Sequence, residues 1–270
     1  MPRLALPAAV VLGVGLGAIL ALGPAAASSA AQASHHASKN LASYGDSAIT
    51  YYYPPASYIP AGEALFGTFC SSCHGVRAEG TSRAPNLVGL GPATVHFWVS
   101  TGRMPAEDPT AVQAPPKPAR LSNLQALQVA AYVNSLDPAR PAIPLVHMNG
   151  ANVNKGAELF ALNCAACHTI TGAGDALAFS TFAPSLRFAT ATQIAEAVRT
   201  GPANMPRFSG NLTDAQVRDV TAYVTRYVQH PTNPGGFGLG GIGPVAEGFV
   251  ALLFGVGVLF LIGYWIGERS

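Results

Sequence analysis

The chain has 270 residues, of which 49% are hydrophobic and 10% are charged, and its formal net charge at pH 7 is +2. The hydrophobic content excludes an intrinsically disordered chain, and the small net charge gives no basis for binding nucleic acid. A charged fraction well below the usual quarter indicates that part of the chain is solvated by lipid. The length suffices for about two domains of modest size.

Residues 1–27 are expected to direct export. An uncharged apolar stretch from Leu4 to Leu22 follows Arg3 and precedes the small residues Ala25 to Ser28, which is the pattern of a signal peptide. The apolar stretch is nearly long enough to span a bilayer, so a cleaved signal and an uncleaved membrane anchor both fit. Residues 28–60 carry no pattern that assigns them to a domain, and we treat them as an extension.

From Ala61 onward the chain contains an internal repeat. The matching pairs, in chain order, are Gly62–Phe66 with Gly156–Phe160, Ala84–Leu87 with Ala183–Leu186, Thr101–Pro105 with Thr200–Pro206, and Ala131–Val133 with Ala222–Val224. Because the order never changes, the sequence predicts a duplicated domain, with copies at residues 61–137 and 155–230. Residues 138–154 between them contain three prolines and an Asn-Gly pair, which is typical of a linker.

Each copy is expected to be helical. One helix leads into a pair of cysteines, a second covers residues 93–100 or 191–200, and a third covers residues 121–136 or 213–229, with Ser122 and Thr213 as candidate N-caps. Strand signals are weak throughout, so the predicted fold class is all-α. A core of about 80 residues is marginal by itself, and each copy therefore needs a further staple.

The four cysteines lie in two copies of one pattern, CSSCH at residues 70–74 and CAACH at residues 164–168. A zinc ribbon needs its second pair roughly 15–20 residues after the first, and a thioredoxin-like pair needs a βαβ context that is missing here. A disulfide within each pair is conceivable outside the cell but leaves the two histidines unexplained. Cys-x-x-Cys-His is the attachment sequence of c-type haem, which would also be the missing staple.

The pattern therefore predicts two covalently bound haem c groups. The expected attachment residues are Cys70, Cys73, Cys164 and Cys167, and the expected iron ligands next to them are His74 and His168.

Two of the four methionines, Met104 and Met205, occupy matching places in the repeat, each after a Thr-Gly turn and before a proline. A thioether is a soft, neutral ligand that raises the potential of haem iron, so these two are the predicted second axial ligands. The alternative is that both only fill the core and that His96 or His147 binds iron. Neither histidine has a counterpart in the other copy.

Two further pairs of residues have expected supporting roles. Pro85 and Pro184 follow the motif histidines at the same stage of the repeat, where their carbonyls could accept the second N–H of the imidazole, although ordinary turn prolines would give the same pattern. Two aromatic pairs, Phe66 with Tyr132 and Phe160 with Tyr223, are expected to join the first and last helices of each copy by packing.

The C-terminal part of the chain is expected to be a membrane anchor. Residues 231–244 form a Gly/Pro-rich tether, residues 245–266 contain an uninterrupted apolar run with Tyr264 and Trp265 at its edge, and residues 267–270 form a short cytoplasmic tail. A buried core helix is the alternative. With export at the N-terminus, this anchor would place the repeated domains on the extracytoplasmic side of the cell membrane.

Each copy resembles a class I cytochrome c, with Gly-x-x-x-Phe, then Cys-x-x-Cys-His, a proline, a ligand methionine and a helix that carries an aromatic residue. From Gly62 to Ser270 the chain resembles the dihaem cytochrome c subunit of the actinobacterial menaquinol–cytochrome c reductase, a bc-type complex. The most specific segments are VSTGRMPA at 99–106, QAP at 113–115, TGPANMP at 200–206, PGGFGLGGIGPVAEG and the terminal WIGERS.

This resemblance implies an electron-transfer subunit of a respiratory translocase with no substrate chemistry of its own. Its partners would be a cytochrome b subunit, a Rieske iron–sulfur protein that donates electrons, and a terminal cytochrome c oxidase that receives them, in a supercomplex. A membrane-anchored dihaem shuttle outside any complex fits the haems and the anchor equally well. A dihaem enzyme such as a peroxidase fits less well, since it needs an open iron position, whereas each copy offers a methionine.

Overall fold

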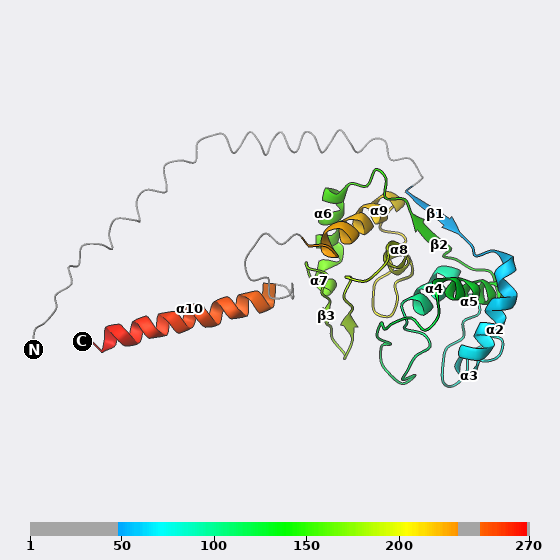
Figure 1. Ribbon diagram of the computed structural model, residues 1–270, viewed down its shortest axis with the longest axis horizontal. Helices are drawn as coiled ribbons and strands as arrows, with labels where there is room; N and C mark the ends of the chain where they lie inside the picture. Colours follow the sequence, from blue (N-terminus) through cyan, green and yellow to red (C-terminus); the bar gives the residue numbers. More distant parts are fainter. Residues whose placement is uncertain (1–47, 232–243, 269–270) are drawn as a thin grey trace, which may run out of the picture. The chain divides into compact units, whose positions relative to one another are not determined.

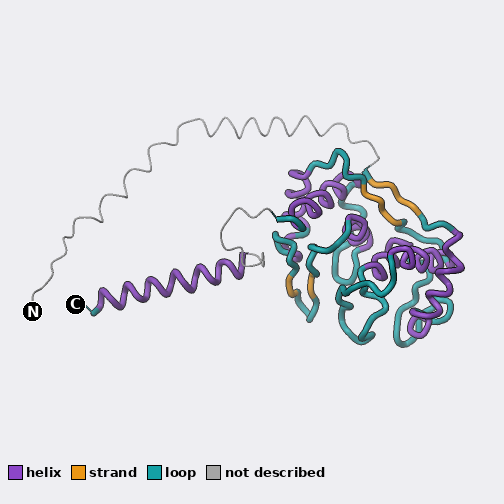
Figure 2. The backbone as a smooth tube through the Cα atoms, viewed as in Figure 1, coloured by secondary structure: helices purple, strands orange, loops and turns teal. Residues whose placement is uncertain are grey.

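The computed structural model describes residues 48–231 and 244–268 (Figures 1 and 2). The expected signal or anchor at 1–27, most of the extension at 28–60 and most of the tether at 231–244 lie outside these residues. The described part is mostly helical, as predicted, and it contains two helical domains in tandem.

The first domain consists of α2 (Ile59–Phe69), α3 (Ser71–His74), α4 (Pro92–Ser100) and α5 (Asn123–Leu136), preceded by the 3₁₀ turn Ala56–Tyr58. Ser122 is the N-cap of α5 and forms a capping box with Gln125, which confirms the predicted helix start. The apolar faces of α2, α4 and α5 meet around Phe66, which is 1% exposed.

The second domain repeats this order with α6 (Val153–Asn163), α7 (Ala165–His168), α8 (Ala191–Thr200) and α9 (Asp214–Tyr223). Thr213 caps α9 through a capping box with Gln216, as predicted. The last helix was expected to continue as a single α-helix to residue 229. Its α-helical part ends at Tyr223, and a π-helical turn, Val224–Val228, follows.

In both domains the first helix crosses the last one at a glycine. A Cβ atom on Gly62 would lie 2.0 Å from the carbonyl oxygen of Gln128, and one on Gly156 would lie 2.1 Å from that of Asp219. Only glycine allows the backbones to approach this closely. Beside each crossing lies the expected aromatic pair, with ring centroids 5.3 Å apart for Phe66 and Tyr132 and 5.5 Å apart for Phe160 and Tyr223.

Within the described residues, four short strands add to the helices, although the sequence showed only weak strand signals. Strand β1 (Ile49–Tyr52), from the N-terminal extension, pairs antiparallel with β2 (Ile143–Val146), from the segment between the domains. Strands β3 (Asp175–Ala176) and β4 (Phe182–Ala183) form a second antiparallel pair. Ile49 is buried in the core of the second domain, so β1 packs on that domain.

The two domains meet where α4 lies against α8, the matching helices of the repeat (Figure 1). His96 on α4 contacts Glu196 on α8, with 2.6 Å between Nδ1 and Oε1, and its Nε2 lies 3.0 Å from Oδ1 of Asn123. The side chains of His96 and Glu196 are both buried. Gln193 also donates to the carbonyl and the hydroxyl of Ser100 across this contact.

The C-terminal helix α10 (Pro244–Gly267) contains an apolar segment, Gly248–Gly267, with a mean hydropathy of 2.4. None of the most apolar window is buried against the other described residues. By length and composition this helix fits a membrane anchor.

Candidate functional sites

Each Cys-x-x-Cys-His motif lies at the same point of its domain. The first helix ends just before the first cysteine, and the amide of Cys70 donates to the carbonyl of Phe66 just as that of Cys164 donates to Phe160. The rest of the motif forms the one-turn helices α3 and α7. Because the motif spans a single helical turn, both thiols and the histidine remain close enough to serve one porphyrin.

The histidine of each motif is oriented by a proline carbonyl. Nδ1 of His74 lies 2.8 Å from the carbonyl oxygen of Pro85, and Nδ1 of His168 lies 2.9 Å from that of Pro184. An imidazole that donates from Nδ1 presents the Nε2 lone pair to a metal. The contact between the histidine and the proline carbonyl is therefore the same in both copies, and it involves the prolines that the sequence predicted.

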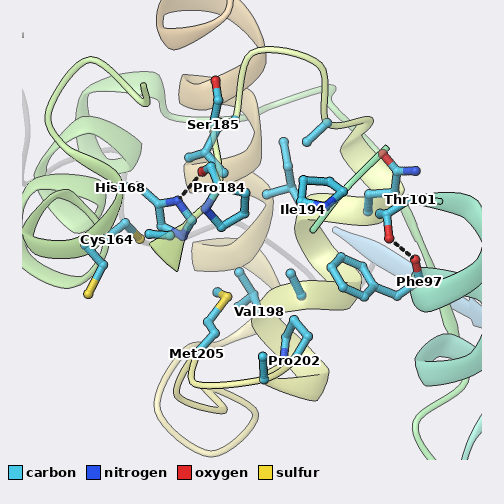
Figure 3. A pocket seen from close by; sticks show the side chains of 18 of the residues that line it. Phe97, Thr101, Cys164, His168, Pro184, Ser185, Ile194, Val198, Pro202 and Met205 are labelled. Atoms are coloured by element: carbon cyan, nitrogen blue, oxygen red, sulfur yellow. Dashed lines mark hydrogen bonds between the residues drawn. The ribbon is translucent and has the colours of Figure 1, made fainter. Parts of the chain in front are cut away.

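The residues of the second site line a cavity of about 610 Å³. Cys164, Cys167 and His168 line one part of it, and Met205, from the loop after α8, lines another; Figure 3 shows the His168 and Met205 side chains pointing into the same space. The volume lies within the range of about 300–1,000 Å³ that is usual for cofactor pockets. A predominantly apolar cavity with two thiols, an imidazole and a thioether fits a covalently bound haem.

Two of the corresponding residues of the first domain pack against its core. Cys70 and Met104 both pack against the cluster formed by Phe66 and its neighbours, from the loops that follow α2 and α4. The amide of Met104 donates to the carbonyl of Trp98, which holds this loop against α4. The same four kinds of side chain are therefore available in the first domain.

The environment of the cysteines disfavours a redox-active thiol pair. Burial raises the pKa of Cys70 and of Cys164 to about 11, and the neighbouring cysteine of each pair contributes in the same direction. Reactive cysteines have a lowered pKa, so these thiols do not resemble a thioredoxin-like site. No group of three or more His, Cys, Asp or Glu side chains in residues 48–231 and 244–268 is arranged to hold a metal ion.

The alternative iron ligands are occupied by other contacts. Both ring nitrogens of His96 have partners, Glu196 and Asn123. His147 lies 2.7 Å from the hydroxyl of Thr50 at the β1–β2 pair. Neither histidine lines the cavity of the second site.

One feature of the second site was missed from the sequence. The first domain supplies part of the cavity wall, and Figure 3 shows two of these residues, Phe97 and Thr101. The others include Arg103, Gln113, Pro116, Lys117 and Pro118. Gln113 ties this segment to the second domain, because its side chain donates to the carbonyl of Phe182 and accepts from the amide of the same residue, both at 3.0 Å. The sequence marked the segments at 99–106 and 113–115 only as part of the family resemblance, and it did not place either of them at the second site.

The repeated helical fold and the two matched sites define a c-type cytochrome with two haem domains. The model of the family "Cytochrome c" matches residues 59–137, and that of "Cytochrome C oxidase, cbb3-type, subunit III" matches residues 151–224. The chain belongs to the family of the cytochrome bc1 complex cytochrome c subunits and carries two covalently bound haem c groups.

Two curated members of this family show the extent of the similarity. The subunit of Corynebacterium efficiens is 38% identical over 232 residues, which cover 78% of this chain and 77% of that protein. The subunit of Mycobacterium tuberculosis H37Rv is 40% identical over 224 residues, covering 80% and 79%. A more distant relative is the cbb3-type cytochrome c oxidase subunit CcoP of Cereibacter sphaeroides, 31% identical over 183 residues, with 61% and 59% covered.

Proposed function

We propose that the chain relays electrons, haem to haem, from a Rieske iron–sulfur protein to a terminal cytochrome c oxidase. It would do so beside a cytochrome b subunit in a menaquinol-oxidising complex. Membership of the bc1 cytochrome c subunit family supports the class of complex. The electron donor, the acceptor and their assembly into a supercomplex are the proposal.

The proposed sites use the same donors in both domains. The thioether bonds would form at Cys70 and Cys73 in the first domain and at Cys164 and Cys167 in the second. His74 with Met104, and His168 with Met205, would be the axial ligands. When bound, haem c supplies a one-electron couple. The carbonyls of Pro85 and Pro184 hold the imidazoles in place, and the methionine thioethers would help to hold the iron and keep small molecules from it.

One observation carries the relay in particular: Arg103, next to the proposed ligand Met104, lines the cavity that contains His168 and Met205. The loop proposed to complete the first haem site is therefore also a wall of the second site. Two redox centres that share a wall are suited to pass electrons directly to each other. A haem enzyme needs one iron with an open ligand position, whereas both domains here offer a methionine. Such an enzyme would also have no need for a wall shared between the two haem sites.

A relay in series can be tested by lowering the potential of one haem at a time. Met104→His and Met205→His each replace a thioether with an imidazole, which keeps six ligands but lowers the potential. In membranes that contain the complete complex, each single variant should lose most of its quinol-driven oxygen uptake. If either variant keeps half or more of the uptake, the two haems do not act in series.

The partners can be tested separately. A tagged full-length chain, solubilised in mild detergent, should copurify with a cytochrome b and a Rieske protein. Isolation of the chain with both haems but without these two subunits would favour a membrane-anchored shuttle.

We further propose that the haem domains face the extracytoplasmic side and that the C-terminal tail is cytoplasmic. The support is the apolar helix α10 at the C-terminal end of the chain together with the export pattern in residues 1–27. Protease added to intact spheroplasts should remove both haem domains. Protection of these domains would contradict the proposed orientation.

A further inference from the structure

Arg103 is a buried cation at the boundary between the domains. Its side chain is only 7% exposed. Its guanidinium carbon lies 4.9 Å from the centroid of the Phe97 ring, and both residues line the cavity with Cys164, His168 and Met205. The guanidinium is therefore stacked on a ring at the edge of the second haem site.

The loop that carries Arg103 is fixed in this place. Gly102 has a φ of +69°, and a Cβ atom there would lie 2.0 Å from the carbonyl oxygen of Lys117, so the chain is folded tightly on itself before Arg103. The amide of Lys117 donates to the carbonyl of Thr101. Together with the bonds from Gln113 to Phe182, these contacts hold the segment against the second domain.

Arg103 differs from the buried arginines Arg199 and Arg218, because none of the described residues gives it an anionic partner. Arg199, also 7% exposed, pairs with Asp214, and Arg218, 4% exposed, pairs with Asp219. No carboxylate of the described residues is within ion-pair distance of Arg103. The nearby Lys117 is itself paired with Glu107, 3.0 Å away.

A buried cation without a counter-charge is strongly disfavoured, so this site needs an anion that the described protein does not provide. Haem c carries two propionate carboxylates, and the planar guanidinium is the side chain best suited to bind a carboxylate with two hydrogen bonds. The cavity that Arg103 lines is the place of the second haem.

We propose that Arg103 of the first domain binds a propionate of the haem held by the second domain. The second haem site is then composite, with its attachment and axial ligands in one domain and its propionate partner in the other. The potential of the second haem depends on the first domain through this contact. This inference rests on the assignment of Cys164, Cys167, His168 and Met205 as the second haem site.

The test uses the full-length protein in a Met205→His background, in which the second haem becomes the low-potential component and the loop at Met104 stays intact. Potentiometric titration followed by visible absorbance then reads the two haems separately. Arg103→Gln removes a positive charge and should lower the potential of the low-potential component more than that of the other. Arg103→Lys keeps the positive charge, so its second haem should have a potential close to that of the protein with Arg103.

A matched control is Arg120→Gln. Arg120 also stacks on an aromatic ring of the first domain, 5.3 Å from the centroid of Phe69, but it is exposed and does not line the cavity. This variant should leave both potentials unchanged.

A potential of the second haem that is unchanged by Arg103→Gln overturns the proposal, and so does a larger shift in the first haem, which would assign Arg103 to the first propionates. If the Arg103→Gln protein does not accumulate, the proposal is tested on the Arg103→Lys protein, by recording the propionate bending bands in its resonance Raman spectrum. They should shift for the second haem, because lysine cannot form the paired hydrogen bonds, and unchanged bands reject the contact. If Met205→His itself fails to lower one potential, the site assignment fails instead, which is a separate result.

Discussion

The two haem domains are alike where a haem is held and different where they meet the rest of the protein. The glycine at the helix crossing, the aromatic pair beside it and the bond from the histidine to the proline carbonyl recur with nearly equal distances. The matching helices α4 and α8 differ, since the buried residues of α4 are apolar except for His96, whereas those of α8 include Glu196, Arg199 and Thr200.

The differences have identifiable partners. Arg199 contacts Asp214 and donates a hydrogen bond to the hydroxyl of Tyr51 on β1. Glu196 contacts His96 of the first domain. The loops before the methionines also differ, and the loop of the first domain closes the cavity of the second. The two copies therefore share the residues of the haem site, whereas the second copy carries the charged residues that contact the first domain and β1.

The largest effect is expected from removing one attachment site. Cys164→Ala with Cys167→Ala, or Cys70→Ala with Cys73→Ala, should leave one covalent haem per chain, and the domain without haem should become unstable because about 80 residues form only a marginal core. Intact mass and a pyridine haemochrome assay of the purified chain measure the haem count. Two haems in either double variant would show that attachment does not depend on these cysteines.

A smaller, symmetric effect is expected at the helix crossings. Gly62→Ala and Gly156→Ala would each force a methyl group onto a backbone carbonyl, which should cost about 1–3 kcal/mol of the free energy of unfolding in either domain. Denaturant unfolding, followed by haem absorbance, measures this. Gly67→Ala is the control on α2: nothing lies near its Cβ position, so it should stabilise slightly. A negligible cost at Gly156 would break the symmetry of the repeat.

The contact between the domains should depend on pH. Burial raises the pKa of Glu196 from its usual 4.5 to about 7, although His96 opposes the shift. Burial lowers the pKa of His96, but the hydrogen bond and charge of Glu196 outweigh it, so the pKa of His96 is raised overall. Besides His96, the titratable group that faces Glu196 is Tyr52 on β1.

Both shifts have the same sign. Each group binds its proton more tightly in the folded protein, so its contribution is fully present below the unfolded pKa and is lost as pH rises through the folded pKa. Between about pH 4.5 and 7 the free energy of unfolding should therefore fall as pH rises, through deprotonation of Glu196. Denaturant midpoints across this range should show a smaller slope in Glu196→Gln, and no change in the exposed control Glu158→Gln. Equal slopes in all three proteins would contradict the account.

The smallest effect is expected at the N-terminal strand. The hydroxyl of Tyr51 donates to Asp214 at 2.7 Å and accepts from Nε of Arg199 at 3.0 Å. Tyr51→Phe should therefore cost about 1 kcal/mol, and only in the second domain. Tyr53→Phe, at an exposed tyrosine of the same stretch, is the control and should be neutral. Unfolding of each domain, read from its own haem, distinguishes the two variants.

The comparison also shows which features a sequence can reveal. The cysteine motifs, the helix starts at Ser122 and Thr213, and the aromatic pairs depend on local spacing or on equivalent places in the repeat, so they could be predicted. The pairing of β1 with β2 joins segments far apart in the chain, and the strands are too short to leave a periodic pattern. The same holds for Glu196 with His96 and for Arg103 at the second cavity, because each contact depends on how the two domains pack.

The central claim is that the two domains bind haem iron through the same pair of donors, His74 with Met104 and His168 with Met205. The weak ferric absorbance band near the red end of the spectrum, which reports an iron–thioether bond, measures this directly. Met104→Ala and Met205→Ala should each keep both covalent haems and lose about half of this band, because the two sites are of one type. The double variant should lose the band entirely. An unchanged band in either single variant would contradict the claim for that domain.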